Sequence, residues 1–217
     1  MLGQNCVYFS HNPRSSIKPG GLTITTSNPL NVLGISGSLR RASYNTALLR
    51  AAAELMPPGM TLEIFDLAPL PLFNEDTEKP FPAAVADFRT RLAQADARLI
   101  ATPEYNSSIS GALKNGIDWA SRSPQQPLNG KPVAIMGAST GNFGTVRAQL
   151  HLRQILTHVG ALPLGKPEVL VARAEQAFDA NGNLVDPAAR GFLRDLLVAL
   201  GRWIERGLPT SRSIPAR

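Results

Sequence analysis

The 217-residue chain contains a single cysteine, Cys6, and only three histidines. One cysteine excludes an intrachain disulfide and supplies too few thiolates for a cysteine-built zinc site. No apolar run approaches the roughly 18 residues that a membrane-spanning helix needs. Aromatic residues make up 6% of the chain and are not interleaved with basic residues, as they are on base-stacking nucleic-acid surfaces. These absences favour a cytoplasmic protein whose partners include neither membrane nor nucleic acid.

Acidic residues are absent from both ends of the chain, although the formal net charge is +6. All 16 acidic residues lie between Glu54 and Glu205, whereas five of the 22 basic residues lie in the ends. Without those five, 17 basic residues stand against 16 acidic ones. The basicity therefore belongs to the ends, which argues against a basic nucleic-acid-binding face.

The two ends also lack a periodic hydrophobic pattern. Residues 1–29 are rich in Ser, Thr, Asn, Pro and Gly, and they lack the basic start and apolar stretch of a secretory signal. We interpret residues 1–29 as a flexible N-terminal extension and residues 207–217 as a flexible tail. Residues 30–206 then form one domain, in keeping with their length and with the 43% hydrophobic content of the chain.

Within this domain, short apolar runs alternate with segments of helical periodicity. Strands are expected at Asn31–Ser36, Met60–Leu67, Ala97–Thr102, Pro132–Gly137 and Glu168–Val171. Helices are expected at Tyr44–Leu55, Phe81–Leu92, Gly111–Ala120, Val146–Val159 and Pro187–Glu205. This alternation predicts a doubly wound α/β fold, with a parallel sheet covered by helices on both faces. Because ligands bind beyond the carboxyl ends of such strands, a site is expected after the first, third and fourth strands.

The segment after the first expected strand, residues 37–46, has the composition of an anion site. Hydroxyl, amide and guanidinium groups come from Ser38, Arg40, Arg41, Ser43, Asn45 and Thr46. The start of the next helix adds free N–H groups and the positive end of its dipole. Neither a dinucleotide fingerprint nor a P-loop is present, which favours a monophosphate. The alternative is that Ser43 is only an N-cap and the arginines are only solvated.

The segment after the third strand, residues 103–111, can present backbone groups to the edge of a planar heterocycle. Tyr105 would then cover a face of that ring. The alternative is a serine-rich turn in which Tyr105 packs on a neighbour.

The segment after the fourth strand contains G-x-S-x-G at residues 137–141, which formally matches a hydrolase nucleophile elbow around Ser139. The downstream histidines, His151 and His158, lie on the helix that leaves this segment, and each turn carries them about 5.4 Å further away. A serine hydrolase is therefore disfavoured. No H-E-x-x-H motif occurs, so no metal site is expected.

Several motifs together resemble the NADPH-dependent FMN reductase family, which includes chromate- and quinone-reducing members. They are Gly37-Ser38-Leu39-Arg40 with Ser43 and Asn45, Pro103-Glu104-Tyr105-Asn106, Leu113-Lys114-Asn115 and Ile117-Asp118-Trp119. The similarity runs from about Asn31 to Glu205.

This resemblance implies a flavodoxin-like fold, with a five-stranded sheet of order 2-1-3-4-5 that binds FMN non-covalently. By position, the FMN phosphate would be held by Ser38, Arg40, Ser43, Asn45 and Thr46. The isoalloxazine would be lined by Pro103, Glu104, Tyr105 and Asn106, with Ser139 on its other side. Many members carry proline where this chain has Ser110, and the serine could loosen the loop over the flavin.

The implied activity is transfer of hydride from NADPH or NADH to FMN, followed by electron transfer to a small acceptor. Quinones, azo compounds, chromate and free flavin are the acceptors that the family implies. The chemistry belongs to the cofactor, so no catalytic acid or base is expected among the side chains. The alternative is a flavodoxin-like electron carrier that serves a protein redox partner, and the nearly neutral domain with its arginine-bearing first loop disfavours it.

The resemblance also implies a homodimer or homotetramer with the flavin sites near the subunit junction. The apolar residues of the fourth expected helix cannot all lie on one stripe of about 100°. They are Leu150, Leu152, Ile155, Leu156 and Val159. This surplus favours a partner subunit. Trp119 is expected in the core or at the subunit interface, where it would add to the surplus, and not as a ligand.

Overall fold

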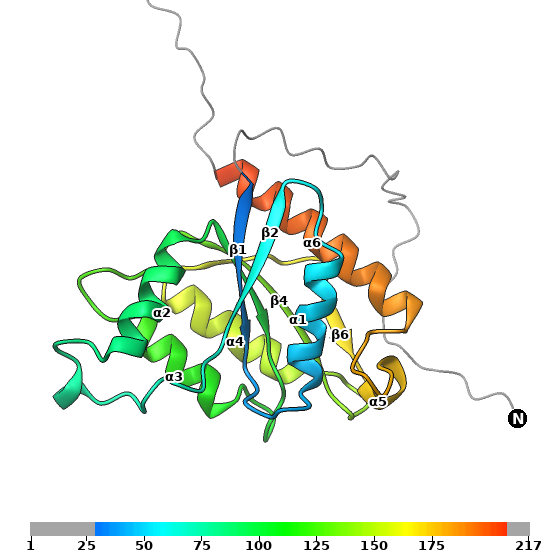
Figure 1. Ribbon diagram of the computed structural model, residues 1–217, viewed down its shortest axis with the longest axis horizontal. Helices are drawn as coiled ribbons and strands as arrows, with labels where there is room; N and C mark the ends of the chain where they lie inside the picture. Colours follow the sequence, from blue (N-terminus) through cyan, green and yellow to red (C-terminus); the bar gives the residue numbers. More distant parts are fainter. Residues whose placement is uncertain (1–28, 208–217) are drawn as a thin grey trace, which may run out of the picture.

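The computed structural model describes residues 29–207 and consists of one parallel sheet between two layers of helices (Figure 1). The expected N-terminal extension, apart from Pro29, lies outside the described residues. The expected tail does too, apart from Gly207, which is the last residue of the final helix.

The strands are β1 (Leu30–Ser36), β2 (Met60–Phe65), β3 (Ala97–Ala101), β4 (Pro132–Ala138), β5 (Leu162–Pro163) and β6 (Val169–Val171). They are ordered β2-β1-β3-β4-β5, and β6 also pairs with β4. Because β5 pairs with the first residues of β4 and β6 with its last three, the two short strands share the fifth position of the sheet. The predicted flavodoxin-like order 2-1-3-4-5 is confirmed. The expected fifth strand, Glu168–Val171, corresponds to β6. The sequence does not predict β5, because two residues are too few to show a period.

The helices are α1 (Tyr44–Glu54), α2 (Ala83–Gln94), α3 (Gly111–Ala120), α4 (Val146–His158), α5 (Ala174–Ala177) and α6 (Pro187–Gly207), with a 3-10 turn η1 (Glu75–Thr77). Helices α1 and α6 cover one face of the sheet, and α2, α3 and α4 cover the other (Figure 1). Of the helices in residues 29–207, none combines the length and hydrophobicity needed to cross a bilayer.

The strands read as continuous apolar runs because successive side chains enter two different cores. In β1, Val32 packs in the core beneath α1 and α6, whereas Leu33 packs in the core beneath α2, α3 and α4. Helix α2 begins at Ala83, two residues later than expected, because Phe81 precedes a proline and this disfavours helical backbone.

Trp119 belongs to the second of these cores and is fully buried. Its ring meets Phe73 edge-on with 4.9 Å between ring centroids, and its Nε1 donates to the carbonyl of Pro71 at 2.8 Å. The expectation that Trp119 contributes to a subunit interface is therefore wrong.

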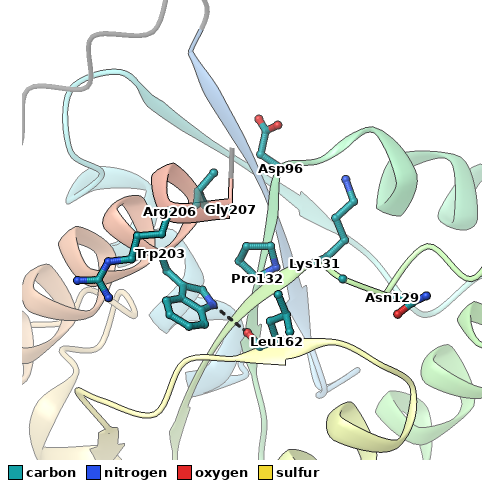
Figure 2. Close-up of a pocket in the computed structure, with 10 residues that line it drawn as sticks. Asp96, Asn129, Lys131, Pro132, Leu162, Trp203, Arg206 and Gly207 are labelled. Atoms are coloured by element: carbon teal, nitrogen blue, oxygen red, sulfur yellow. Dashed lines mark hydrogen bonds between the residues drawn. The ribbon is translucent and has the colours of Figure 1, made fainter. Parts of the chain in front are cut away.

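The amino ends of the strands carry a cavity of about 470 Å³ (Figure 2). Lys131, Pro132 and Leu162 line it from the strand side. Trp203 lines it from α6, and its Nε1 donates to the carbonyl of Leu162. This cavity lies at the opposite edge of the sheet from the three segments that were expected to form the site.

Candidate functional site

Three loops meet at the carboxyl ends of the central strands, at the lower edge of the sheet in Figure 1. Loop 1 (residues 37–43) follows β1, loop 2 (residues 102–110) follows β3, and loop 3 (residues 139–145) follows β4. Each loop starts by extending the sheet: Gly37 N donates to Ala101 O, Thr102 N to Met136 O, and Ser139 N to Val171 O. The doubly wound topology thus brings the expected segments together at one edge.

Asn45, in the first turn of α1, joins loop 1 to the end of β4. Its Nδ2 donates to the carbonyl of Ala138 at 3.0 Å, and its Oδ1 accepts from the Ala138 N–H at 2.9 Å. The side chain is buried. The side-chain amide of Asn45 therefore uses one donor and its acceptor oxygen in bonds to the backbone of Ala138.

Ser110 joins loop 2 to loop 1. Its hydroxyl donates to the carbonyl of Gly37 and accepts from the N–H of Leu113 at 3.1 Å, so it also caps α3. The serine thus fixes the base of loop 2, and the expected loosening of this loop is not observed.

Glu104 joins loop 2 to the helix that follows loop 3. Its carboxylate accepts from the N–H groups of Arg147 at 2.9 Å and Ala148 at 3.2 Å, and it pairs with the Arg147 guanidinium. Together, the side chains of Asn45, Ser110 and Glu104 connect the three loop regions. Asn45 joins α1 to the end of β4, Ser110 joins loop 2 to loop 1, and Glu104 joins loop 2 to α4.

Loop 1 has the donor set that a phosphate monoester needs. Ser43 is the N-cap of α1, and its Oγ accepts from Asn45 N and Thr46 N. Thr46 Oγ1 lies 2.9 Å from Ser36 Oγ, and Ser38 Oγ accepts from the N–H of Arg40. These hydroxyls surround a helix N-terminus, where anions bind favourably.

The two arginines of loop 1 are both exposed, but they differ in their surroundings. Arg40 places its guanidinium 5.4 Å from the centre of the Tyr44 ring, in the first turn of α1. This contact holds the charge of Arg40 beside the start of the helix.

Each loop also exposes one large apolar side chain. Leu39 in loop 1, Tyr105 in loop 2 and Phe143 in loop 3 are each more than half exposed. Exposed apolar groups gathered at one place on a domain indicate a binding surface. Hydroxyls and a helix N-terminus beside apolar side chains suit a ligand with a phosphate at one end and a planar ring at the other, so the residues fit FMN.

Tyr105 is 52% exposed. The backbone of Tyr105 and Ser108 exchanges two hydrogen bonds of 3.0 Å, which closes a tight turn. The central residues of this turn, Asn106 and Ser107, have φ values of 50° and 62°. The turn therefore projects Tyr105 and Asn106 outward from the sheet edge, where both are exposed.

Pro103 and Ser139 complete the predicted set, and Ser139 is half-buried. Pro103 is buried directly after β3. Ser139 Oγ accepts from the N–H of Gly141, which stabilises the turn of loop 3. His151 Nδ1 lies 3.1 Å from Ser108 Oγ in loop 2, so this histidine pairs with loop 2 and not with Ser139.

Four further residues lie at this site, although the sequence assigns them no role in FMN binding: Gly137, Phe143, Arg147 and His151. A Cβ on Gly137 would overlap Thr145 Oγ1 and the carbonyl of Thr102, so only glycine allows loop 3 to pack against loop 2. The sequence offered this glycine only as the first position of a hydrolase motif. Its actual role depends on the neighbouring strand.

A family model of NADPH-dependent FMN reductases matches residues 30–176. The chain belongs to this family.

Curated members of the family are similar over most of their length. An NAD(P)H-dependent FMN reductase of Pseudomonas aeruginosa is 55% identical over 181 residues, which cover 83% of this chain and 98% of the relative. A 2-hydroxy-1,4-benzoquinone reductase of Burkholderia sp. is 39% identical, covering 81% of this chain and 96% of the relative. Among solved structures, a flavoenzyme NAD(P)H:(acceptor) oxidoreductase from Paracoccus denitrificans has a TM-score of 0.76 at 34% identity, covering 82% of this chain and 98% of that one.

Membership of the NADPH-dependent FMN reductase family fixes the activity in outline. The protein is an oxidoreductase with FMN as cofactor and NAD(P)H as electron donor, and it passes electrons to a small acceptor. The predictions of family, fold, activity and cofactors are confirmed. The assignment of individual residues to FMN stays a prediction.

Proposed function

We propose that the three loops bind FMN, with its phosphate at loop 1 and its isoalloxazine ring against loops 2 and 3. The phosphate ligands are Ser38, Arg40, Ser43 and Thr46, with Asn45 fixing the helix start. The ring contacts come from Pro103, Tyr105, Asn106 and the backbone of Glu104, with Ser139 on the other side. The carboxylate of Glu104 is bonded to the start of α4 and is not one of these contacts. The single observation that carries this proposal is the gathering of hydroxyls, a helix N-terminus and three exposed apolar side chains at one sheet edge.

We further propose that the electron acceptor is a quinone and that the protein works in the reducing cytoplasm. When bound, FMN supplies the redox chemistry between the nicotinamide and the acceptor. The residues of the chain bind the FMN and orient the nicotinamide and the acceptor against it. Leu39, Tyr105 and Phe143 form an apolar rim that suits a flat, weakly polar acceptor. Relatives named as quinone reductases support this choice, including one from Escherichia coli that is 40% identical over 83% of this chain.

The test is to reconstitute the purified protein with FMN and follow the flavin absorbance after adding NADPH without oxygen. We expect one FMN per chain, bleaching within seconds, and recovery of the absorbance when a benzoquinone is added. Release of FAD on denaturation, or no flavin after reconstitution, would contradict the binding site. An FMN-loaded protein that NADPH leaves yellow would instead be an electron carrier for a protein partner. If chromate, an azo dye or free FMN restores the flavin absorbance but quinone does not, the acceptor is not a quinone.

Replacing Arg40 by alanine is expected to weaken FMN binding by about 1.5–3 kcal/mol, the usual loss for a charge-assisted hydrogen bond. Arg41→Ala is the matched control and should change the affinity much less, because only Arg40 is held at the helix start by Tyr44. Titration of the apoprotein with FMN measures both constants. Equal losses would mean that loop 1 acts as a diffuse basic patch.

We also propose a homodimer, or a tetramer of dimers, in which α3 and α4 face the partner subunit. Leu152 and Leu156 are buried on the sheet, but Leu150 is exposed. Ile155 and Val159 line a groove of about 560 Å³ between α4 and α3. Light scattering behind a sizing column tests this. A single species near 23 kDa that retains FMN and full turnover would contradict it.

A further inference from the structure

Glu104 belongs to loop 2, but its carboxylate forms its hydrogen bonds with the start of α4. The side chain is only 11% exposed. One carboxylate oxygen accepts from the N–H groups of Arg147 and Ala148, at 2.9 and 3.2 Å, and the other accepts from Arg147 Nη1 at 2.9 Å. The carboxylate therefore does not point freely into the proposed ring site.

The element that receives this carboxylate is the first turn of α4. The N-cap of this helix, Thr145, makes no capping hydrogen bond with its side chain, and the first turn contains no acidic residue. The first N–H groups of a helix have no partner within it, and they carry the positive end of the helix dipole. Glu104, 43 positions earlier in the chain, takes the place of the missing cap.

Three charged groups are therefore in contact beside loops 2 and 3. They are the negative carboxylate of Glu104, the positive guanidinium of the half-exposed Arg147, and the partial positive charge of the α4 N-terminus. In the folded protein the carboxylate offsets most of the positive charge of the guanidinium and the helix end. Removing any one of them changes the field along the edge where the loops meet.

We propose that Glu104 is a positioning residue that locks loop 2 onto the start of α4 and, by neutralising that helix end, sets the reduction potential of FMN. This rests on the proposed binding of the flavin ring against loops 2 and 3. A flavin gains negative charge when it is reduced. A positive field at the ring therefore favours the reduced form, and a negative field favours the oxidised form.

The decisive experiment compares the two-electron midpoint potential of FMN in the wild-type holoprotein with that in Glu104→Gln and Arg147→Gln. Glutamine keeps the shape of Glu104 but leaves Arg147 and the helix end without their counter-charge. We expect Glu104→Gln to raise the affinity for reduced FMN relative to oxidised FMN about tenfold, which is about 30 mV more positive for a two-electron couple. Arg147→Gln leaves the carboxylate less neutralised, so its potential should move in the negative direction.

The matched control is Glu63→Gln, which removes a carboxylate that pairs with Arg91 in the last turn of α2, away from the three loops. Its potential should equal that of the wild type. The proposal is overturned if Glu104→Gln lowers the melting temperature but leaves the potential within the control's range, because Glu104 is then only a helix cap. It is also overturned if the Glu104 and Arg147 variants shift the potential in the same direction.

Failure of the proposed function gives a different result, because the wild type itself would then take up no FMN. If Glu104→Gln does not fold, the half-exposed Arg147 still decides the matter. An unchanged potential in a folded, FMN-loaded Arg147→Gln protein would also overturn the proposal.

Discussion

Replacing Asn45 by alanine is expected to lower the free energy of unfolding by about 2–6 kcal/mol. The change leaves the N–H and the carbonyl of Ala138 without their partners in a buried position. Each unsatisfied buried group costs about 1–3 kcal/mol. Because Asn45 also fixes α1 against β4, FMN affinity should fall with stability. Urea denaturation of the apoprotein and FMN titration measure the two effects.

The control for the stability effect is Ser43→Ala, two residues earlier, which removes the N-cap of α1. Because Ser43 is also a proposed phosphate ligand, the two variants are compared by urea denaturation of the apoprotein alone. Loss of such a cap typically costs about 1 kcal/mol. A loss in Asn45→Ala no larger than that of the cap variant would show that the bridge between α1 and β4 contributes little.

Trp119→Ala should destabilise the protein by about 3–5 kcal/mol, the range found for large aromatic residues removed from a core. The side chain is fully buried against Phe73 and Phe81 and donates to the carbonyl of Pro71. Denaturant unfolding with tryptophan-independent detection by circular dichroism measures the loss. Trp119→Phe keeps most of the apolar volume and should lose less.

A core residue and an interface residue respond differently to protein concentration. The loss in Trp119→Ala should persist at the lowest protein concentration that can be measured, because the contacts lie within one chain. A variant that is as stable as the wild type but associates more weakly would contradict the core assignment and restore Trp119 to a subunit interface.

The fold was largely predictable because buried parallel strands and amphipathic helices leave strong patterns in the sequence. Helix α3 begins and ends at the predicted residues. Arg98 shows the limit of this reasoning, because it lies fully buried within β3 and donates to the carbonyls of Ala95 and Pro127. Burial lowers the pKa of Arg98 to about 10. Nothing local in the sequence distinguishes this arginine from an exposed one.

The residue types of the site were also predictable, but several of their contacts were not. The bridges made by Asn45, Ser110 and Glu104 span 93, 73 and 43 positions of the chain. A motif shows which groups are available after a strand, but not whether a tertiary neighbour already uses them. Asn45 and Glu104 were therefore predicted as ligands of FMN, whereas the structure shows their polar groups engaged with the protein.

The divided fifth position of the sheet bears on how copies of this chain can meet. An exposed edge strand is a template onto which another molecule can add its own strand. Here that edge consists of the two residues of β5 and the three of β6. One of these five is Pro163, which has no N–H to donate. Runs this short offer little for strand addition, so the edge resists the open-ended stacking of sheets that leads to aggregation.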